Sequence, residues 1–252
     1  MKKKQWRAYT DLAWTDSIIA PPKDYAEETD LFVEAIKEDS KIETKTLLHL
    51  GCGAGGHDFT FKKHFKVTGV DISEEMLEIA KGINPEIDYI SGDMRTVNLG
   101  ESFDAVAIPD SIMHMITIDD LRKSINTASQ HLKPGGVLLI VAHIKEEFRD
   151  NNFVYTGAKG DIEITIFENN TIIKPDRTTY EAVVVYLIRR KGRLEIHSDV
   201  CTGGLFPLAT WLSLFKAQKY NVRQIKLEQS YDRYLLEGGK YILRVFICGK
   251  PI

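Results

Sequence analysis

The sequence predicts an α/β fold built on a doubly wound, mostly parallel sheet of seven strands with an antiparallel last strand, plus an inserted antiparallel β meander. Three observations lead to this prediction. Over residues 1–147, short apolar runs alternate with helical patterns. From 148 to 203, one strand pattern follows another. Residues 204–252 then return to a helix and two strands, so we expect the middle segment to be inserted into one fold.

The first part of the chain is expected to supply a cap helix and five parallel strands. Residues 24–38 place apolar side chains at helical spacing. Ser73 and Asp119 are suited to cap two of the helices that connect the strands. Alternating strands and helices are typical of a parallel sheet with crossover connections. The five β-rich runs are 46–50, 67–71, 88–91, 103–108 and 137–142.

The segment 148–203 has a different pattern. Isoleucines alternate with polar residues from 162 to 166, and Lys191–Gly192 separates two long β-rich runs. These features predict an antiparallel meander, which we interpret as a lid. Because exposed strands can pair with another chain, we also expect a homodimer contact here. After the meander, Pro207 begins a helix, and two strands follow near 222–229 and 240–248.

Composition and charge narrow the class of protein. The 252 residues are 43% hydrophobic and 27% charged, which is typical of a globular protein. A net charge of −3 provides no broad positive field, so no nucleic-acid partner is expected. No signal peptide is evident, and no apolar run approaches the ~20 residues that span a bilayer, so we expect no membrane partner and a cytoplasmic location.

The cysteines point to the same compartment. Cys52, Cys201 and Cys248 are odd in number and far apart. This spacing fits neither a disulfide framework nor a zinc site. We therefore expect a reducing compartment and no metal.

A glycine-rich turn follows the first strand. The turn Gly51-Cys52-Gly53-Ala54-Gly55-Gly56 lets backbone amides approach a ligand without a Cβ in the way. Asp71 ends the second strand, where an acid can accept hydrogen bonds from a ribose diol. Both features lie at the carboxyl edge of the predicted sheet, where open α/β folds bind nucleotides.

This pattern alone also fits a nicotinamide enzyme, because Gly51, Gly53 and Gly56 satisfy G-x-G-x-x-G. The segment Gly92-Asp93-Met94, after the third strand, adds a second acid beside an apolar side chain. That combination suits an adenine amino group and its ring. A second acid there is not part of the dinucleotide fingerprint, so it disfavours a nicotinamide-dependent oxidoreductase.

Taken in order, the motifs resemble those of class I S-adenosylmethionine-dependent methyltransferases. The resemblance implies a Rossmann-like fold, S-adenosyl-L-methionine as cofactor, and methyl transfer to a small-molecule acceptor by in-line displacement. It assigns 1–147 to the cap helix and nucleotide-binding part, 148–203 to the insertion, and 204–252 to the rest of the methyltransferase domain. A cofactor-binding regulatory module without turnover stays an alternative. The matching segments are 47–56, 70–73, 92–94, 103–104 and 132–136.

The resemblance also implies roles for individual residues. Gly51 and Gly53 would pass beneath the methionine part, and Asp71 would bind the ribose with Ile72 against the adenine. His49 departs from the family, which often has an acid there, so the anchor of the cofactor's amino group stays open, and a structural histidine is the alternative. The full set of expected cofactor contacts is Tyr9, Gly51, Cys52, Gly53, Asp71, Ile72, Met76, Gly92, Asp93, Met94 and Pro109.

The segment 108–115, after the fourth strand, is the candidate acceptor site. His114 is the candidate base, because histidine titrates near neutral pH, and a histidine that only shapes the pocket is the alternative. Trp14 and Asp110 are further candidate substrate contacts. Tyr9 and His114 are loosely similar to positions in methyltransferases that N-methylate nucleotide-linked amino sugars, where the tyrosine closes over the cofactor. A core aromatic residue is the alternative for Tyr9.

Overall fold

The computed structural model describes residues 6–174, 177–228, 230–238 and 240–252. Its larger part is a seven-stranded sheet of order β10-β11-β5-β4-β1-β2-β3. All strand pairs are parallel except those of β11, which is antiparallel to both β5 and β10. The predicted sheet and its reversed last strand are therefore confirmed. The strands are β1 (Thr46–Leu50), β2 (Lys66–Asp71), β3 (Asp88–Ser91), β4 (Phe103–Ile108), β5 (Leu132–Ala142), β10 (Asn221–Leu227) and β11 (Leu243–Gly249).

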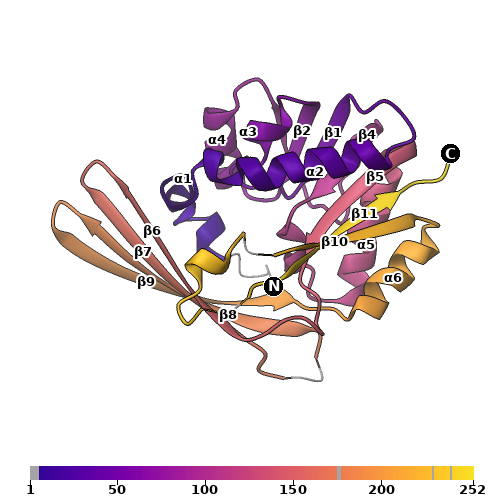
Figure 1. The fold of residues 1–252 in the computed structure, drawn as a ribbon. Helices are drawn as coiled ribbons and strands as arrows, with labels where there is room; N and C mark the ends of the chain where they lie inside the picture. The colour runs from indigo at the N-terminus through magenta and orange to yellow at the C-terminus, as the bar shows by residue number, and fades with distance from the viewer. Residues whose placement is uncertain (1–5, 175–176, 229, 239) are drawn as a thin grey trace.

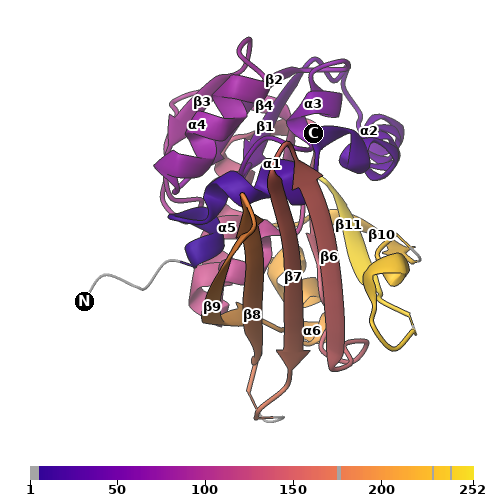
Figure 2. The same cartoon turned by 90° about the vertical axis from the view of Figure 1, so that its left-hand side faces the viewer.

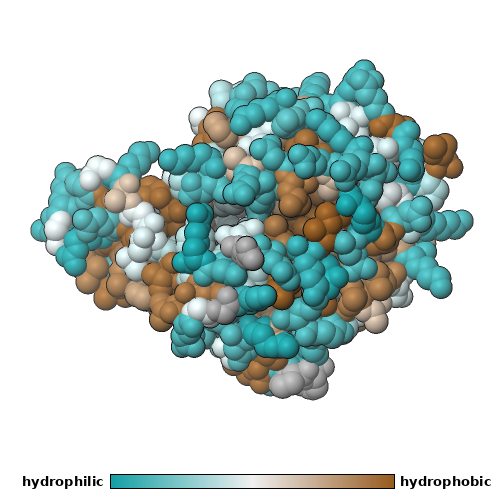
Figure 3. Space-filling model, in the orientation of Figure 1, coloured by the Kyte–Doolittle hydropathy of each residue, from teal (hydrophilic) through white to brown (hydrophobic). Residues whose placement is uncertain are grey.

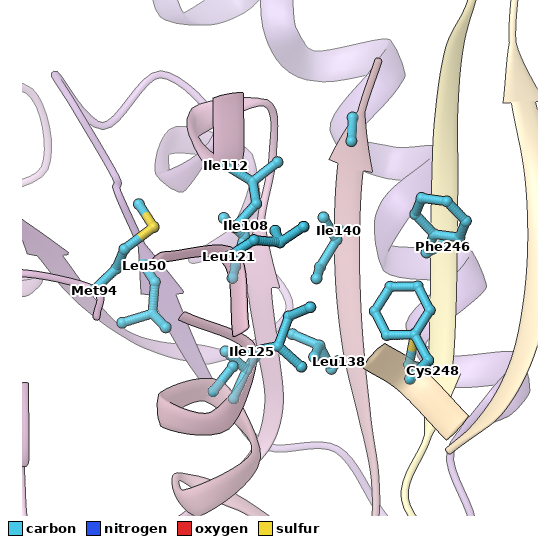
Figure 4. Close-up of a cluster of buried hydrophobic side chains, with 14 of the residues drawn as sticks. Leu50, Met94, Ile108, Ile112, Leu121, Ile125, Leu138, Ile140, Phe246 and Cys248 are labelled. Carbon is cyan, nitrogen blue, oxygen red and sulfur yellow. The ribbon is translucent and has the colours of Figure 1, made fainter. Parts of the chain in front are cut away.

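Helices cover both faces of this sheet (Figure 1). Successive residues of a strand point to opposite faces, so Leu47 enters one apolar cluster with Phe32 and Phe61, whereas Leu48 enters the other. The second cluster, drawn in Figure 4, packs α5 and α6 against β4, β5 and β11. The helices are α2 (Ala26–Asp39), α3 (Asp58–Phe61), α4 (Glu74–Ile83), α5 (Ile118–Gln130) and α6 (Leu208–Ala217).

One predicted helix cap is confirmed and one is wrong. The Ser73 hydroxyl accepts a hydrogen bond from the Met76 amide at 3.1 Å at the start of α4. At the start of α5 the cap is Thr117, whose side chain accepts from the Asp120 amide, and Asp119 lies inside the first turn. An acid in the first turn still stabilises the helix through the helix dipole, which explains why Asp119 suggested the start of a helix.

A second, four-stranded sheet projects from the first (Figures 1 and 2). Its order is β6-β7-β8-β9, and every pair is antiparallel, so the predicted meander is confirmed. Opposite residues of paired strands share a face, which places Tyr155, Ile166 and Tyr186 on one face together. We call this the inner face. The strands are β6 (Asn151–Lys159), β7 (Ile162–Thr171), β8 (Thr179–Arg190) and β9 (Arg193–Gly204).

The N-terminal segment lies between the two sheets. Leu12 is buried with Ile164, Ile166 and Tyr186 of the inner face, and Ile18 packs directly on Gly157 of β6. The short helices of this segment therefore bridge the second sheet and the glycine-rich turn. They are η1 (Arg7–Tyr9), η2 (Ala13–Thr15), α1 (Asp16–Ile19) and η3 (Pro22–Tyr25).

Candidate functional site

The glycine-rich turn joins β1 to the start of α3 at the carboxyl edge of the sheet. Gly51 and Gly53 have φ values of 72° and 53°, a left-handed conformation that glycine adopts without a steric penalty. The Gly51 amide donates to the Val70 carbonyl at 2.7 Å. A Cβ on Gly51 would overlap the Ser111 hydroxyl and approach Met94. The missing side chain therefore allows the turn to lie against both the third-strand and fourth-strand loops.

Asp71 fixes this turn from the neighbouring strand. One carboxylate oxygen accepts from the Gly53 amide at 2.8 Å and the other from the Ser73 amide at 2.9 Å. Each oxygen keeps a further lone pair with which it can accept from a ribose hydroxyl. The next residue, Ile72, is 56% exposed. A large apolar side chain exposed beside such an acid is suited to cover an adenine ring.

The third-strand loop places Asp93 and Met94 near the same turn. Both oxygens of Asp93 accept from the Arg95 guanidinium, which also donates to Asp120 at 2.9 Å. Asp93 is therefore paired within the protein. Met94 is almost fully buried, and Gly92 packs closely on Val97.

The remaining expected cofactor contacts border the turn in different ways. Met76 lies 3.4 Å from the position of a Cβ on Gly53. Cys52 is buried with its sulfur toward Gly69, so its side chain faces into the sheet, and burial raises the pKa of its thiol. Pro109 is buried directly after β4, and its carbonyl accepts from the Ser111 amide at 2.7 Å.

His49 belongs to a buried polar group on the far side of the turn. Its Nδ1 lies 2.7 Å from Asp58 Oδ1, and the Tyr89 hydroxyl donates to the other oxygen of Asp58. The ring is 1% exposed, and Nε2 has no hydrogen-bond partner in the part of the chain that the structure describes. These contacts favour a structural histidine that fixes the start of α3.

The N-terminal segment reaches over both the turn and the candidate base. The Tyr9 carbonyl accepts from the Ser73 hydroxyl, beside Asp71. The Tyr9 ring meets the His114 ring edge-on at 5.1 Å, and Trp6 meets it at 5.0 Å. Tyr9 and His114 are thus brought together. Trp14 lies elsewhere, against the second sheet with the Arg190 guanidinium 4.2 Å above its ring.

Asp110 is the strained residue of the site. It follows β4 and precedes the short helix η4 (Ser111–His114). Its φ of 57° is unusual for a residue with a side chain, and such strain is concentrated at functional sites. Its Oδ1 atom is enclosed and has no hydrogen-bond partner among the described residues. Burial, together with the charge of Glu168, raises the pKa of Asp110 to about 6.

Sequence reasoning missed Glu168 and most of the buried tyrosines whose pKa values the charge of Asp110 helps to raise. Glu168 lies on the inner face of β7, two positions after Ile166, where the alternation of 162, 164 and 166 would continue with an apolar side chain. A carboxylate that interrupts a buried stripe was the available signal. The tyrosines gave no local signal, because they come from widely separated segments.

A cavity of about 200 Å³ lies between the segment after β5, the start of β6 and the segment before β11. Its lining includes His143 and Tyr241, whose side chains are joined by a hydrogen bond of 2.8 Å. Burial lowers the pKa of His143 to about 4, so its ring is neutral at physiological pH. Arg149 and Lys240 also line the cavity, together with three acids, Glu147, Asp150 and Glu237.

In the described ranges, no set of three or more histidine, cysteine or acidic side chains is placed to hold a metal ion. None of the helices in those ranges is both long and apolar enough to cross a membrane.

Comparison with known proteins identifies a methyltransferase domain within the chain. Residues 47–136 match the model of a family described as a methyltransferase domain. Over 120 residues the chain is 36% identical to a dTDP-4-amino-2,3,4,6-tetradeoxy-D-glucose N,N-dimethyltransferase of Saccharopolyspora spinosa, covering 47% of this chain and 48% of that protein. It is 34% identical to a dTDP-3-amino-3,4,6-trideoxy-α-D-glucopyranose N,N-dimethyltransferase of Streptomyces venezuelae, covering 47% and 50%. The matches thus span about half the length of these relatives.

Solved structures show the same fold over nearly the whole chain. DesVI of Streptomyces venezuelae has a TM-score of 0.78 at 24% identity, covering 99% of this chain and all of that chain. CalS10, an amino pentose methyltransferase of Micromonospora echinaspora solved with S-adenosylmethionine, has a TM-score of 0.74 at 22% identity, covering 98% and 99%. Neither a nicotinamide oxidoreductase nor a regulatory module is supported. Residues 47–136 therefore form a methyltransferase domain, in line with the motif resemblance, and the chain shares the fold of these solved methyltransferases.

Proposed function

We propose that this chain uses S-adenosyl-L-methionine to methylate the amino group of a small-molecule acceptor, and that nucleotide-linked amino sugars are its substrate class. The observation that carries this proposal is the meeting of three features at one sheet edge. The glycine turn held by Asp71, the segment with Asp110 and His114, and the aromatic cover from Tyr9 all lie there. The names of the amino-sugar dimethyltransferases support the acceptor class.

The residues at the turn fit the cofactor. The left-handed glycines leave a cradle that a Cβ on Gly51 would fill, Asp71 has free lone pairs, and Ile72 is exposed. When bound, the cofactor supplies an electrophilic methyl group on a sulfonium. We assign its contacts to Tyr9, Gly51, Cys52, Gly53, Asp71, Ile72, Met76, Gly92, Asp93, Met94 and Pro109, with Cys52 acting through its backbone.

The acceptor side is assigned to the segment after β4. In-line displacement depends on holding the acceptor nitrogen close to the methyl carbon and aligned with it, which contributes a large share of the rate. His114 acts on the acceptor and not on the cofactor, and Asp110 contacts the acceptor directly. Trp14 stays a weaker candidate, because it packs on the second sheet.

A turnover assay with methyl-labelled cofactor tests the proposal. We expect label transfer to a dTDP-linked amino sugar and none to the analogue with a hydroxyl in place of the amino group. A calorimetric titration should show binding of S-adenosylmethionine and no binding of NAD. Cofactor binding without transfer to any amine would favour a regulatory module instead.

The second sheet is also part of the proposal, as a lid and as a homodimer contact. Its outer face exposes Phe167, Leu194, Ile196 and Val200, and hydrophobic surface lies along the projecting lobe in Figure 3. Exposed apolar patches of this kind mark interaction surfaces. Light scattering should give a dimer for the parent and a monomer for Ile196→Glu. The location we propose is cytoplasmic.

A further inference from the structure

Two acidic residues belong to segments that pack on each other: the inner face of the second sheet contacts the segment after β4, where the Tyr180 hydroxyl lies 3.6 Å from Met113 Sδ. Asp110 lies at the carboxyl end of β4, and Glu168 lies on the inner face of β7. The charge of Glu168 acts on Asp110 strongly enough to raise its pKa, after the effect of burial. Burial also raises the pKa of Glu168. Both groups are deep in the protein, yet each keeps some accessible surface, as side chains do when they line a hollow.

The two acids differ in how they are held. Glu168 accepts a hydrogen bond from the Asn170 amide group at 2.8 Å. Asp110 has an enclosed oxygen without a partner and a strained backbone. Burying a carboxylate oxygen without a hydrogen bond is costly. A buried group of this kind indicates a ligand that donates to it.

Buried tyrosines belong to the electrostatic surroundings of Asp110. Six of them have pKa values raised first by burial, with the charge of Asp110 as a further cause. They come from the N-terminal segment, the second sheet and the C-terminal part of the chain. Tyrosine faces attract cations, and aromatic cages recognise substituted ammonium groups. The six are Tyr9, Tyr25, Tyr155, Tyr180, Tyr231 and Tyr241.

Three further titratable groups, Glu28, Asp16 and His57, add no positive charge near neutral pH. Glu28 is a further acid whose pKa is raised, to about 7, by burial and then by Asp110, despite the hydrogen bond from Tyr231. Burial raises the pKa of Asp16 to about 6. Burial lowers the pKa of His57 to about 3. Within the described ranges, no lysine or arginine shifts the pKa of Asp110 or Glu168.

We propose that Asp110 and Glu168 form the receptor for the ammonium group of the acceptor: together they hold it as a cation, and Asp110 takes its proton. This rests on the proposed function. The ammonium N–H bond breaks, its electron pair stays on nitrogen, and the proton bonds to the Asp110 carboxylate. Inside a buried site, the resulting neutral pair of amine and carboxylic acid is less penalised than the ion pair.

The nitrogen lone pair freed in this way would be available to the methyl group that the cofactor supplies when bound. As the N–C bond formed, the S–C bond would break and its electrons would return to sulfur, so charge and atoms would balance. The cofactor also carries cations, and an acid could serve those instead. Glu168 favours the acceptor, because it belongs to the second sheet, opposite the glycine turn.

Binding measurements, which need no turnover, distinguish acids that hold the acceptor from acids that hold the cofactor. S-adenosylhomocysteine, which lacks the transferable methyl group, is added first. Calorimetry then compares dTDP-3-amino-3,6-dideoxy-α-D-glucopyranose with its 3-hydroxy analogue. We expect the parent to bind the amine on the order of a hundredfold more tightly, and D110N and E168Q to lose this preference. Asparagine tolerates positive φ, so D110N should keep the backbone.

Asp161→Asn, at the exposed turn before β7, is the matched control and should keep the preference. The proposal is overturned if D110N and E168Q retain the preference for the amine. It is also overturned if they weaken binding of S-adenosylhomocysteine itself as much as binding of the amine, because the acids would then serve the cofactor.

A second probe makes the test independent of the sugar nucleotide. Methylammonium chloride should raise the thermal unfolding temperature of the parent above that in equal sodium chloride, and this effect should vanish in D110N. If the parent binds neither sugar nucleotide, the unfolding temperature with methylammonium alone tests the carboxylate pair. A methylammonium effect would then support the carboxylate pair while the proposed acceptor class fails. Its absence would overturn the pair. If D110N and E168Q keep the preference for the amine and still transfer label to it, the proposed function would stand and the proposed carboxylate pair would be refuted.

Discussion

The cofactor edge and the acceptor face of this molecule are built in opposite ways. Most of the cofactor edge comes from one continuous stretch, between β1 and the loop after β3, and relies on backbone amides, glycines and Asp71, while Tyr9 and Pro109 lie outside this stretch. The proposed acceptor face is assembled from the N-terminal segment, the loop after β4 and the second sheet. Short motifs therefore identify the cofactor, whereas only the folded chain brings the acceptor residues together.

The largest expected effect tests the acceptor face. Asp110→Asn should lower turnover of an amine by roughly 10²- to 10⁴-fold, the range for losing a general base. Cofactor affinity should stay within about twofold, because the glycine turn and Asp71 are untouched. Steady-state rates and calorimetry on the same preparation check both halves. An equal loss of cofactor affinity would show that the two regions are not separable.

The next prediction tests the cofactor edge. Asp71→Ala removes charge-assisted hydrogen bonds to the turn and to the ribose, which are worth about 1.5–3 kcal/mol. We therefore expect cofactor affinity to fall about tenfold to a hundredfold, and circular dichroism should confirm an intact fold. Asp93→Ala is expected to weaken binding as well. Unchanged affinity in both variants would remove the adenine and ribose assignments.

A third prediction concerns stability without ligands. The pKa of Asp110 is raised from 3.8 to about 6, so the folded protein is penalised while this group is ionised. That shift corresponds to at most about 3 kcal/mol, and partial solvent access lowers it to about 1–2 kcal/mol. The parent should gain stability as pH falls from 7 through 6 toward 4, because the folded state takes up the proton first.

Asp110→Asn should be more stable than the parent at pH 7 by that amount and should lack this part of the pH dependence. Urea unfolding at pH 5 and pH 7 measures both. Asp16 and Glu28 contribute with the same sign in each protein, so only the difference between parent and variant is informative. A less stable variant at pH 7 would indicate that Asp110 has a structural partner.

The smallest effect is expected at His114, if the carboxylate pair takes the proton. His114→Gln should then lower turnover only a few-fold and leave cofactor affinity unchanged, since glutamine keeps the bulk next to Trp6 and Tyr9. A loss on the order of a hundredfold, together with loss of a rate limb near pH 6 to 7, would instead identify His114 as the base.

These differences explain what the sequence could predict. Strand periodicity predicted both sheets, and the spacing from Gly51 to Asp71 predicted the cofactor turn, because each signal lies within about 20 residues. The Asp119 cap was wrong because Thr117 competes two residues earlier. The proposed Asp110–Glu168 pair could not be predicted, since its members are far apart in sequence and belong to different sheets.

The close approach of Gly51 to Ser111 sets a limit on how new specificities could arise. Ser111 donates to the Leu50 carbonyl at 3.1 Å, and a Cβ on Gly51 would overlap the Ser111 side chain. The loop after β4 can therefore change little without disturbing the nucleotide. Strand β7 carries no such constraint. Diversification toward other acceptors, natural or engineered, should accumulate on the inner face around position 168 while the glycine turn is inherited unchanged.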